Sequence, residues 1–377
     1  MSSDPIDDLN RLADELELLH RESTPAGTGL EALLHVMAGR GASDLLLVAG
    51  EPPVFRVNGL VHRADAALLD ADDIEQMVAP MLPPHAQRAF RDAGIADASL
   101  RLPGVGRFRV NLHRERGRAA AVVRMLPKLV PRLASLDLPP GTDTLTRLGQ
   151  GLVLIGGATG SGKTTTMAAL VEEINRRDAK HIITIEDPIE FEHTNQRSVI
   201  QQIEVGIDAP DFPTALRAAL RQAPDVIVIG EMRDPDTMRI ALAAGETGHL
   251  VFSTLHTTDV SSTVSRLTDS FPAERQATIR QEIAAALSAV YVQTLLPRVG
   301  GGRVPAAQAL MVGYGARQHI RRNTLQHLHQ EITITRKQGS FTLEECLARL
   351  VKSGAVSRAD AALRAQHADD FEHALAT

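Results

Sequence analysis

A phosphate-binding loop set between an apolar strand and a helix constrains this chain more than any other feature. The segment Gly157-Ala158-Thr159-Gly160-Ser161-Gly162-Lys163-Thr164 matches the pattern G-x-x-x-x-G-K-[ST]. It follows the apolar run 152–155 and precedes the helix-like stretch 165–174. In such a loop successive backbone N–H groups point at phosphate oxygens. A glycine-rich turn that binds nothing would have no use for Lys163, so the pattern predicts a nucleoside triphosphate site.

The loop also assigns roles within that site. Lys163 can reach the β- and γ-phosphates, and the Thr164 hydroxyl can ligate Mg²⁺. We therefore expect ATP and Mg²⁺ as cofactors. The predicted nucleotide-binding residues are Gly157, Thr159, Gly160, Ser161, Gly162, Lys163, Thr164 and Thr165.

Composition limits the classes of protein to which the chain can belong. With 377 residues and 44% hydrophobic content, we expect at least two globular domains. No run approaches eighteen apolar residues and the N-terminus is acidic, so we expect a cytoplasmic protein without membrane insertion. The net charge of −6 gives no general attraction to nucleic acid. One cysteine, Cys346, cannot form an intrachain disulfide or a multi-cysteine zinc site, and we expect it to be a small core residue.

The pattern of breaks and short strands divides the chain into four parts. Residues 1–29 form a polar extension and linker, and 30–127 form a small α+β domain. Its expected strands are 44–48, 53–57, 107–111 and 120–124, with a turn at Asn58-Gly59. The proline-rich stretch 128–142 is expected to be an interdomain hinge, followed by the ATPase domain, 143–377.

In the second domain, apolar runs alternate with amphipathic helices. The runs 152–155, 182–185, 226–229 and 250–253 predict parallel strands buried on both faces, hence an α/β fold. Near the end, Ile279, Ile283, Leu287, Val290 and Leu295 follow helical spacing. That stretch is interpreted as a core-facing helix rather than as a surface for a partner.

Ligands of parallel sheets bind at the carboxyl ends of the strands, where three polar groups occur here. Glu186, Asp187 and Glu190 follow 182–185, and one of them could polarise the attacking water; the alternative is a solvated capping loop. Glu231 follows 226–229 and could hold Mg²⁺. His256 follows 250–253 and could sense the γ-phosphate, although histidines at such positions are also ordinary hydrogen-bonding residues.

Three longer runs carry a resemblance to a known family. Residues 183–191 (ITIEDPIEF), 220–234 (LRQAPDVIVIGEMRD) and 246–257 (ETGHLVFSTLHT) resemble the Asp box, Walker B and His box of secretion-superfamily ATPases. Within that superfamily the chain is similar to the PilT-like retraction motors of type IV pili, from about residue 30 to about 365. The single cysteine excludes the four-cysteine zinc element of the related assembly and type II secretion ATPases.

The resemblance implies a fold, an activity and further site residues. It implies a PAS-like N-terminal domain, a RecA-like ATPase domain with C-terminal helices, and a homo-hexameric ring. Glu190 would activate water, Glu231 would support Mg²⁺, and His256 would couple the γ-phosphate to the next subunit. Arg109 and Arg124 would complete the ATP site of a neighbour. The implied partner is an inner-membrane pilus platform protein, which would hold the motor at the cytoplasmic face of that membrane.

Some residues depart from the family pattern and keep alternatives open. Ala158 replaces the usual proline of the loop, and residues 315–320 diverge from the segment associated with retraction. The alternatives are an accessory PilU-like motor, a motor of another machine, or an ATP-binding scaffold with little turnover of its own. A RecA-like nucleic-acid translocase is disfavoured by the acidic charge balance.

Overall fold

The computed structural model describes residues 29–377, and the chain divides into two compact units between Lys128 and Leu129. We describe each unit by itself. The expected N-terminal extension, apart from Gly29, lies outside the described residues. Among residues 29–377, no helix combines the length and the apolar character that a bilayer span requires.

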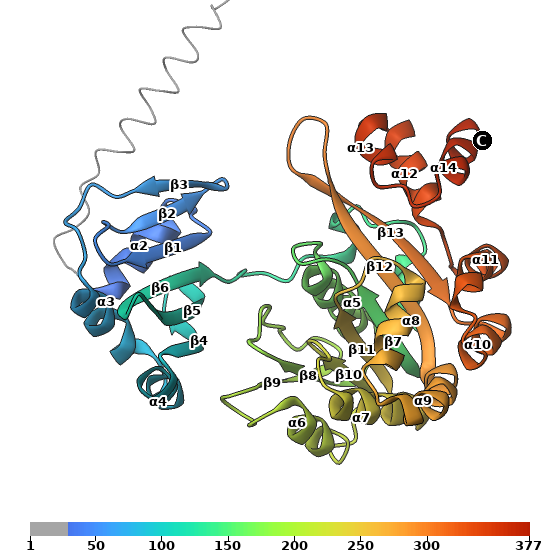
Figure 1. The fold of residues 1–377 in the computed structure, drawn as a ribbon, viewed down its shortest axis with the longest axis horizontal. Helices are drawn as coiled ribbons and strands as arrows, with labels where there is room; N and C mark the ends of the chain where they lie inside the picture. The colour runs from blue at the N-terminus through green and yellow to red at the C-terminus, as the bar shows by residue number, and fades with distance from the viewer. Residues whose placement is uncertain (1–28) are drawn as a thin grey trace, which may run out of the picture. The chain divides into compact units, whose positions relative to one another are not determined.

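The first unit is a six-stranded antiparallel sheet with helices packed on it (Figure 1). The strands lie in the order β3-β2-β1-β6-β5-β4. The elements are α2 (Leu30–Gly39), β1 (Asp44–Val48), β2 (Val54–Val57), β3 (Leu60–Arg63), α3 (Ala71–Val78), α4 (Pro84–Ala93), β4 (Ile95–Leu102), β5 (Gly106–Glu115) and β6 (Arg118–Met125).

The expected strands of this unit are all present, and two more accompany them. Asn58 and Gly59 have φ of 49° and 84°, as a tight hairpin turn between β2 and β3 requires. The sequence did not indicate β3 or β4. β3 is largely exposed, and β4 mixes small, charged and apolar residues, so neither carries a clear alternating pattern.

The second unit is built on a seven-stranded sheet in the order β13-β12-β7-β11-β10-β8-β9. All neighbouring strands are parallel except the β12–β13 hairpin. The strands are β7 (Gly151–Gly156), β8 (His181–Glu186), β9 (Val199–Glu204), β10 (Val226–Ile229), β11 (Leu250–Leu255), β12 (Leu287–Pro297) and β13 (Arg303–Met311). The predicted parallel sheet is confirmed for all four expected strands.

Helices cover both faces of this sheet (Figure 1). Along β7, Leu152 and Leu154 face one apolar cluster while Val153 and Ile155 face the other. α5 (Lys163–Arg177) packs in the second cluster. The opposite face is covered by α6 (Phe212–Ala219), α7 (Pro235–Glu246), α8 (Val260–Asp269) and α9 (Ala273–Ala286). Strands buried on both faces explain why their sequences are continuously apolar.

The helix expected over residues 279–295 is corrected by the structure. Helix α9 ends at Ala286 and strand β12 begins at Leu287. Ile279, Ile283, Leu287 and Val290 are fully buried, so the interpretation as core is confirmed while the element type is wrong from Leu287 onward. A strand buried on both faces does not need to alternate apolar with polar residues. The apolar residues of β12 therefore happen to continue the helical spacing of α9.

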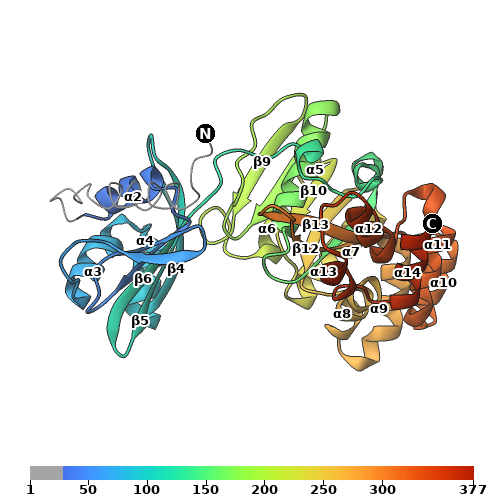
Figure 2. The same ribbon diagram turned by 90° about the horizontal axis from the view of Figure 1, so that it is seen from above.

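Short helices complete the second unit beyond β13. They are α10 (Tyr314–Arg321), α11 (Leu328–Ile334), α12 (Leu343–Lys352), α13 (Arg358–Ala362) and α14 (Ala368–Ala376). Helices α12 and α14 lie side by side in Figures 1 and 2 and share an apolar cluster with the ends of β12 and β13. Cys346 is buried in this cluster, as the sequence predicted.

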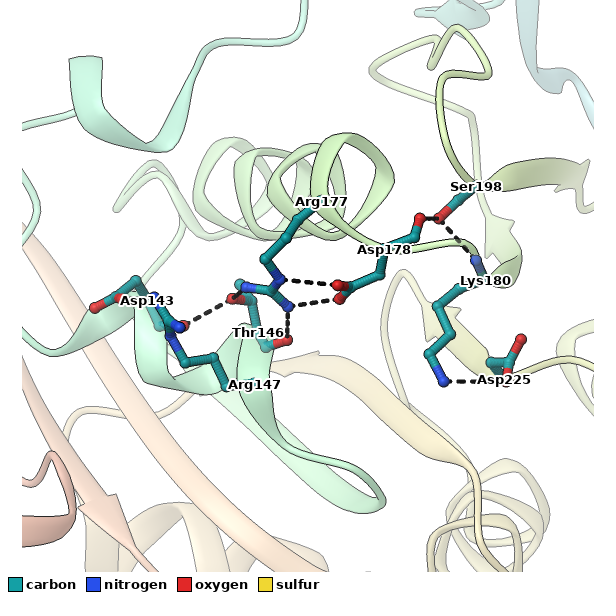
Figure 3. A network of polar contacts seen from close by, with 8 residues as sticks. All are labelled: Asp143, Thr146, Arg147, Arg177, Asp178, Lys180, Ser198 and Asp225. Carbon is teal, nitrogen blue, oxygen red and sulfur yellow. Dashed lines mark hydrogen bonds and ion pairs between the residues drawn. The ribbon is translucent and has the colours of Figure 1, made fainter.

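A polar network fixes the end of α5 that lies away from the phosphate loop (Figure 3). Arg177 donates to the Thr146 hydroxyl at 2.9 Å and to the Thr146 carbonyl at 2.6 Å, and it pairs with Asp178 at 2.6 Å. Lys180 pairs with Asp225 at 3.2 Å beside it. Within the stretch expected to be a hinge, Leu133 packs against the α5 face of the sheet, whereas Leu129 is 82% exposed.

Candidate nucleotide site

The phosphate loop leaves the carboxyl end of β7 and enters the N-terminus of α5. Two glycines are required there. A Cβ on Gly157 would lie 2.3 Å from Ser161 Oγ and 2.6 Å from the Gln293 carbonyl, and Gly162 has a φ of 87°. The free N–H groups of the first helical turn therefore face the loop, together with the positive end of the helix dipole. This geometry suits a polyphosphate.

A buried glutamine on β12 holds the loop against the helix. The Gln293 amide nitrogen donates to the Ser161 carbonyl at 2.7 Å, and its oxygen accepts from the Thr166 hydroxyl at 2.8 Å. The side chain of Gln293 bridges loop and helix while remaining only 4% exposed. The motifs of the sequence do not assign Gln293 to the site. The available signal was a lone amide in a largely apolar strand, which must find buried partners.

The lysine of the loop is buried at the centre of the site. Lys163 is 7% exposed and donates to the carbonyls of Gly157 at 2.8 Å and Ala158 at 3.0 Å. Burial lowers the pKa of Lys163, while the nearby Glu231 carboxylate opposes that shift. Incoming phosphate oxygens would offer this ammonium better partners than two neutral carbonyls.

Glu231 and His256 lie close to Lys163, as expected from their places after β10 and β11. Desolvation and then the positive charge of Lys163 lower the pKa of His256, and Glu231 partly offsets this. Glu231 also pairs with Arg233 at 2.7 Å. The Thr254 hydroxyl donates to the Gly230 carbonyl at 2.6 Å, which ties the two strand ends together. The lysine, the acid and the histidine thus share one electrostatic environment at the carboxyl edge of the sheet.

Two of the three candidate carboxylates at the carboxyl end of β8, Glu186 and Glu190, occupy different environments. Glu186 is 8% exposed and accepts from the Thr184 hydroxyl at 2.7 Å and the Gln202 amide at 3.2 Å. Burial raises its pKa, and the Glu190 backbone N–H also bonds to it. Glu190 is half-buried on the loop that follows. The Glu186 carboxylate is buried and enclosed by protein donors, which leaves it little access to an external water, whereas Glu190 is more exposed.

Glu186 nevertheless borders the nucleotide side of α5. A cavity of about 10 Å³ is lined by Thr164 on α5 and by Thr184 and Glu186 on β8. That volume accommodates about one water molecule. A Cβ placed on Gly230 would lie 3.4 Å from the Glu186 Cα, which is ordinary contact, so Gly230 and Glu186 are neighbours in the fold. The sequence could not show this neighbourhood because the two residues lie on different strands.

The predicted cation ligands have suitable chemistry. Mg²⁺ prefers oxygen donors and keeps several waters, binding proteins through one or two such groups together with substrate phosphates. Thr164 supplies a hydroxyl in the first turn of α5, and Glu231 supplies a carboxylate near Lys163. These residues fit Mg²⁺ delivered with a nucleotide.

The two predicted arginines belong to the first unit, where they are cross-strand neighbours. Arg109 on β5 lies directly opposite Arg124 on β6, and Arg124 is in turn opposite Asp44 on β1. Arg124 pairs with Asp44 at 2.8 Å, and Arg109 with Asp97 at 3.6 Å. Their side chains are 66% and 46% exposed. Like charges opposite each other destabilise a sheet, and the two carboxylates offset that repulsion here.

Comparison with known proteins identifies the family. The family model described as Type II/IV secretion system protein matches residues 106–365. The chain belongs to this family. As a Type II/IV secretion system protein of the PilT type, it is an ATPase with an N-terminal domain and a RecA-like ATPase domain, so the fold class and the activity implied by the resemblance are confirmed.

Individual relatives cover nearly the whole chain. The type IV pilus retraction ATPase PilT of Pseudomonas aeruginosa is 41% identical over 90% of this chain and 98% of its own length. The type IV pilus ATPase PilU of the same organism is 35% identical over 90% of both chains. A crystal structure of the pilus retraction motor PilT with bound ADP matches with a TM-score of 0.83 and 37% identity, covering 92% of this chain and 99% of that one. A bound nucleotide in that relative supports the assignment of a nucleotide site here.

Proposed function

We propose that this chain is an ATP-driven motor for type IV pilus retraction that works as a homo-hexameric ring. The observation that carries the proposal is the convergence of Lys163, Glu231 and His256 at the carboxyl edge of the sheet. It occurs in a chain that aligns with 98% of a retraction ATPase and is more similar to it than to the PilU protein.

Each residue of this site has a role in phosphoryl transfer. Lys163 and the N–H groups of the loop would bind the β- and γ-phosphates, and Thr164 and Glu231 would hold Mg²⁺. When bound, that ion would supply positive charge to the phosphate oxygens. Glu190 accepts a proton from the attacking water or orients it. His256 senses the γ-phosphate in this proposal; in the nucleotide-free chain burial, and then the charge of Lys163, lower its pKa.

The arginines of the first unit act on the site of a neighbouring subunit in this proposal. Arg109 and Arg124 place two cations on one exposed face, which suits the charge of a transferring phosphoryl group. An arginine supplied by another subunit contributes roughly 10³–10⁵ in rate in comparable enzymes. Hydrolysis would then break the contact between these arginines and the γ-phosphate of the neighbouring subunit. The two units could rotate about residues 128–142, and that rotation would produce movement.

The same proposal includes a partner and a place in the cell. A motor of this kind acts on the cytoplasmic side of an inner-membrane platform protein, which holds it at that membrane without insertion. The absence of a membrane-spanning helix among residues 29–377 is compatible with attachment through a partner.

Steady-state Mg²⁺-ATP hydrolysis per subunit, measured as a function of protein concentration, tests the proposal. A site completed by a neighbour gains activity as rings form, so we expect a cooperative rise that tracks the hexamer fraction measured by light scattering. Lys163→Ala is the control for contaminating ATPases. No turnover at concentrations where hexamers are present would reject an autonomous motor in favour of an accessory scaffold.

A further inference from the structure

Three potential metal ligands meet near the C-terminus, remote in sequence from the nucleotide site. They are His329 in α11, His367 at the N-cap of α14 and Asp370 in the first turn of α14. One ligand atom from each lies within 4.8 Å of the others. His329 Nε2 is 3.3 Å from Asp370 Oδ2, and the imidazole rings of His329 and His367 are tilted by 38° with centroids 4.1 Å apart.

We propose that His329, His367 and Asp370 form a divalent transition-metal site, with Zn²⁺ as the fitting ion. Two imidazoles and one carboxylate are a usual donor set for Zn²⁺, and a fourth position is left to water. With bonds of about 2.0–2.1 Å, ligand atoms of tetrahedral Zn²⁺ lie roughly 3.3 Å apart. Because the His329 and Asp370 side chains are 30% and 59% exposed, rotation can close the remaining gap.

The backbone that carries these ligands is already held in place. The backbone N–H groups of Gln366 and His367 both donate to Glu344 Oε1, at 3.0 and 3.1 Å. Glu344 lies on α12 and is 1% exposed. These hydrogen bonds to the buried Glu344 carboxylate fix where α14 begins. Less conformational entropy is therefore lost when a metal ion binds. The ion would join α14 to α11, two helices that meet only through the tertiary fold.

The residues around the three ligands predict how tightly the site binds Zn²⁺. His329 and Asp370 also line a cavity of about 510 Å³ between α11, α12 and α14, so solvent reaches the ion. That cavity carries Arg336, Arg349 and Lys352 on its wall, and Arg336 is paired with Glu345. Nearby cations oppose a bound divalent ion. We therefore expect weaker binding than at a closed four-ligand structural zinc site.

Metal binding to the full-length, nucleotide-free chain tests this proposal. After EDTA treatment and its removal, Zn²⁺ is titrated by calorimetry, and thermal unfolding is measured with and without Zn²⁺. We expect one equivalent bound per chain at this site and a rise in Tm, because an ion that binds only the folded state stabilises it. Mg²⁺, a hard cation, should not reproduce the rise.

Variants decide which residues hold the ion. His329→Ala and His367→Ala should each lose this equivalent or weaken it by at least about tenfold, and should lose the Zn²⁺-dependent rise in Tm. Tm in EDTA reports separately whether a variant has become less stable. His35→Ala, which changes an exposed histidine of the first unit, is the matched control and should bind like the parent. Absence of a Zn²⁺-dependent rise in the parent, or its survival in both site variants, would overturn the proposal.

Discussion

Glu186 ends strand β8 and Glu190 lies four residues further on in the following loop, and their surroundings differ. Glu186 is enclosed by donors from Thr184, Gln202 and the Glu190 backbone, whereas Glu190 is half-buried beyond the strand end. The residue pattern alone left these carboxylates equivalent, and only the resemblance to the ATPase family singled out Glu190. Position in the tertiary structure distinguishes a buried structural acid from a candidate catalytic base, and each role has its own test.

Glu190→Gln should abolish turnover without abolishing nucleotide binding. We expect hydrolysis to fall by about 10²–10⁴, since an amide cannot accept the proton of the attacking water. Equilibrium binding of ATP and single-turnover hydrolysis separate the two effects. Glu192→Gln, two residues further on, is the matched control and should hydrolyse ATP like the parent. Parental turnover in Glu190→Gln would remove Glu190 from the catalytic role.

Glu186→Gln should stabilise the protein at neutral pH. Burial raises the pKa of Glu186 above its ordinary value of 4.5, so the folded state retains this proton to higher pH than the unfolded chain. Stability is therefore lost as pH rises from about 4.5 through the raised pKa, and glutamine removes that loss. Urea unfolding between pH 4.5 and 8 measures the difference. Exposed Glu274→Gln should follow the parental profile, and a parental profile for Glu186→Gln would contradict the burial argument.

At the scale of elements, β12 links the sheet core to the phosphate loop through one side chain. Gln293 spans from Ser161 in the loop to Thr166 in α5, and it occupies a strand buried on both faces. A strand in this position can adjust the loop without contacting the nucleotide. The register of β12 beside β7 is thus part of the nucleotide site.

Gln293→Ala should weaken both the fold and the binding of ATP. Losing two buried hydrogen bonds costs about 1–3 kcal/mol of stability. If half of that free energy restrains the loop, KM for ATP rises roughly two- to twelvefold. Gln308→Ala on β13 removes an equally buried amide that bonds to Gln366 instead, so it controls for lost burial. We expect it to lower stability while leaving KM near the parental value; equal KM for the two variants would remove Gln293 from the site.

At the scale of the whole molecule, the proposed mechanism requires charges that the two units supply separately. The second unit contributes the loop, Glu190, Glu231 and His256, and the first contributes Arg109 and Arg124. In the proposed mechanism the arginines add the charge that accelerates phosphoryl transfer at the site of the second unit. Whether the arginines act within a subunit or across subunits decides between two architectures of the motor.

Mixing two inactive variants tests directly whether the arginines act within a subunit or across subunits. Lys163→Ala and Arg124→Ala should each be nearly inactive alone. After equimolar mixing, the Lys163→Ala subunit can donate its arginines to the intact loop of the other, and about one interface in four should be complete. Recovered ATPase activity supports a site completed by the neighbour. Arg118→Ala, an exposed arginine on the same strand, should be active without mixing. A mixture as inactive as its components would contradict the shared site.

The sequence alone determined the α/β sheet, its phosphate loop and the motifs of the ATPase family, because these depend on local patterns. Apolar runs specify buried strands, and fixed spacing specifies a loop at the start of a helix. The β2–β3 turn at Asn58-Gly59 was predictable for the same reason.

Only the tertiary structure decided features that depend on contacts between distant segments. It showed that α9 ends at Ala286 and β12 begins at Leu287. The sequence could not show this boundary because the apolar residues keep the same spacing across it. It brought Gln293 to Ser161, which lies 132 residues away in the sequence. It also placed His329 beside His367. Burial likewise separated Glu186 from Glu190. No local pattern encodes such proximities, because they arise from how strands and helices pack.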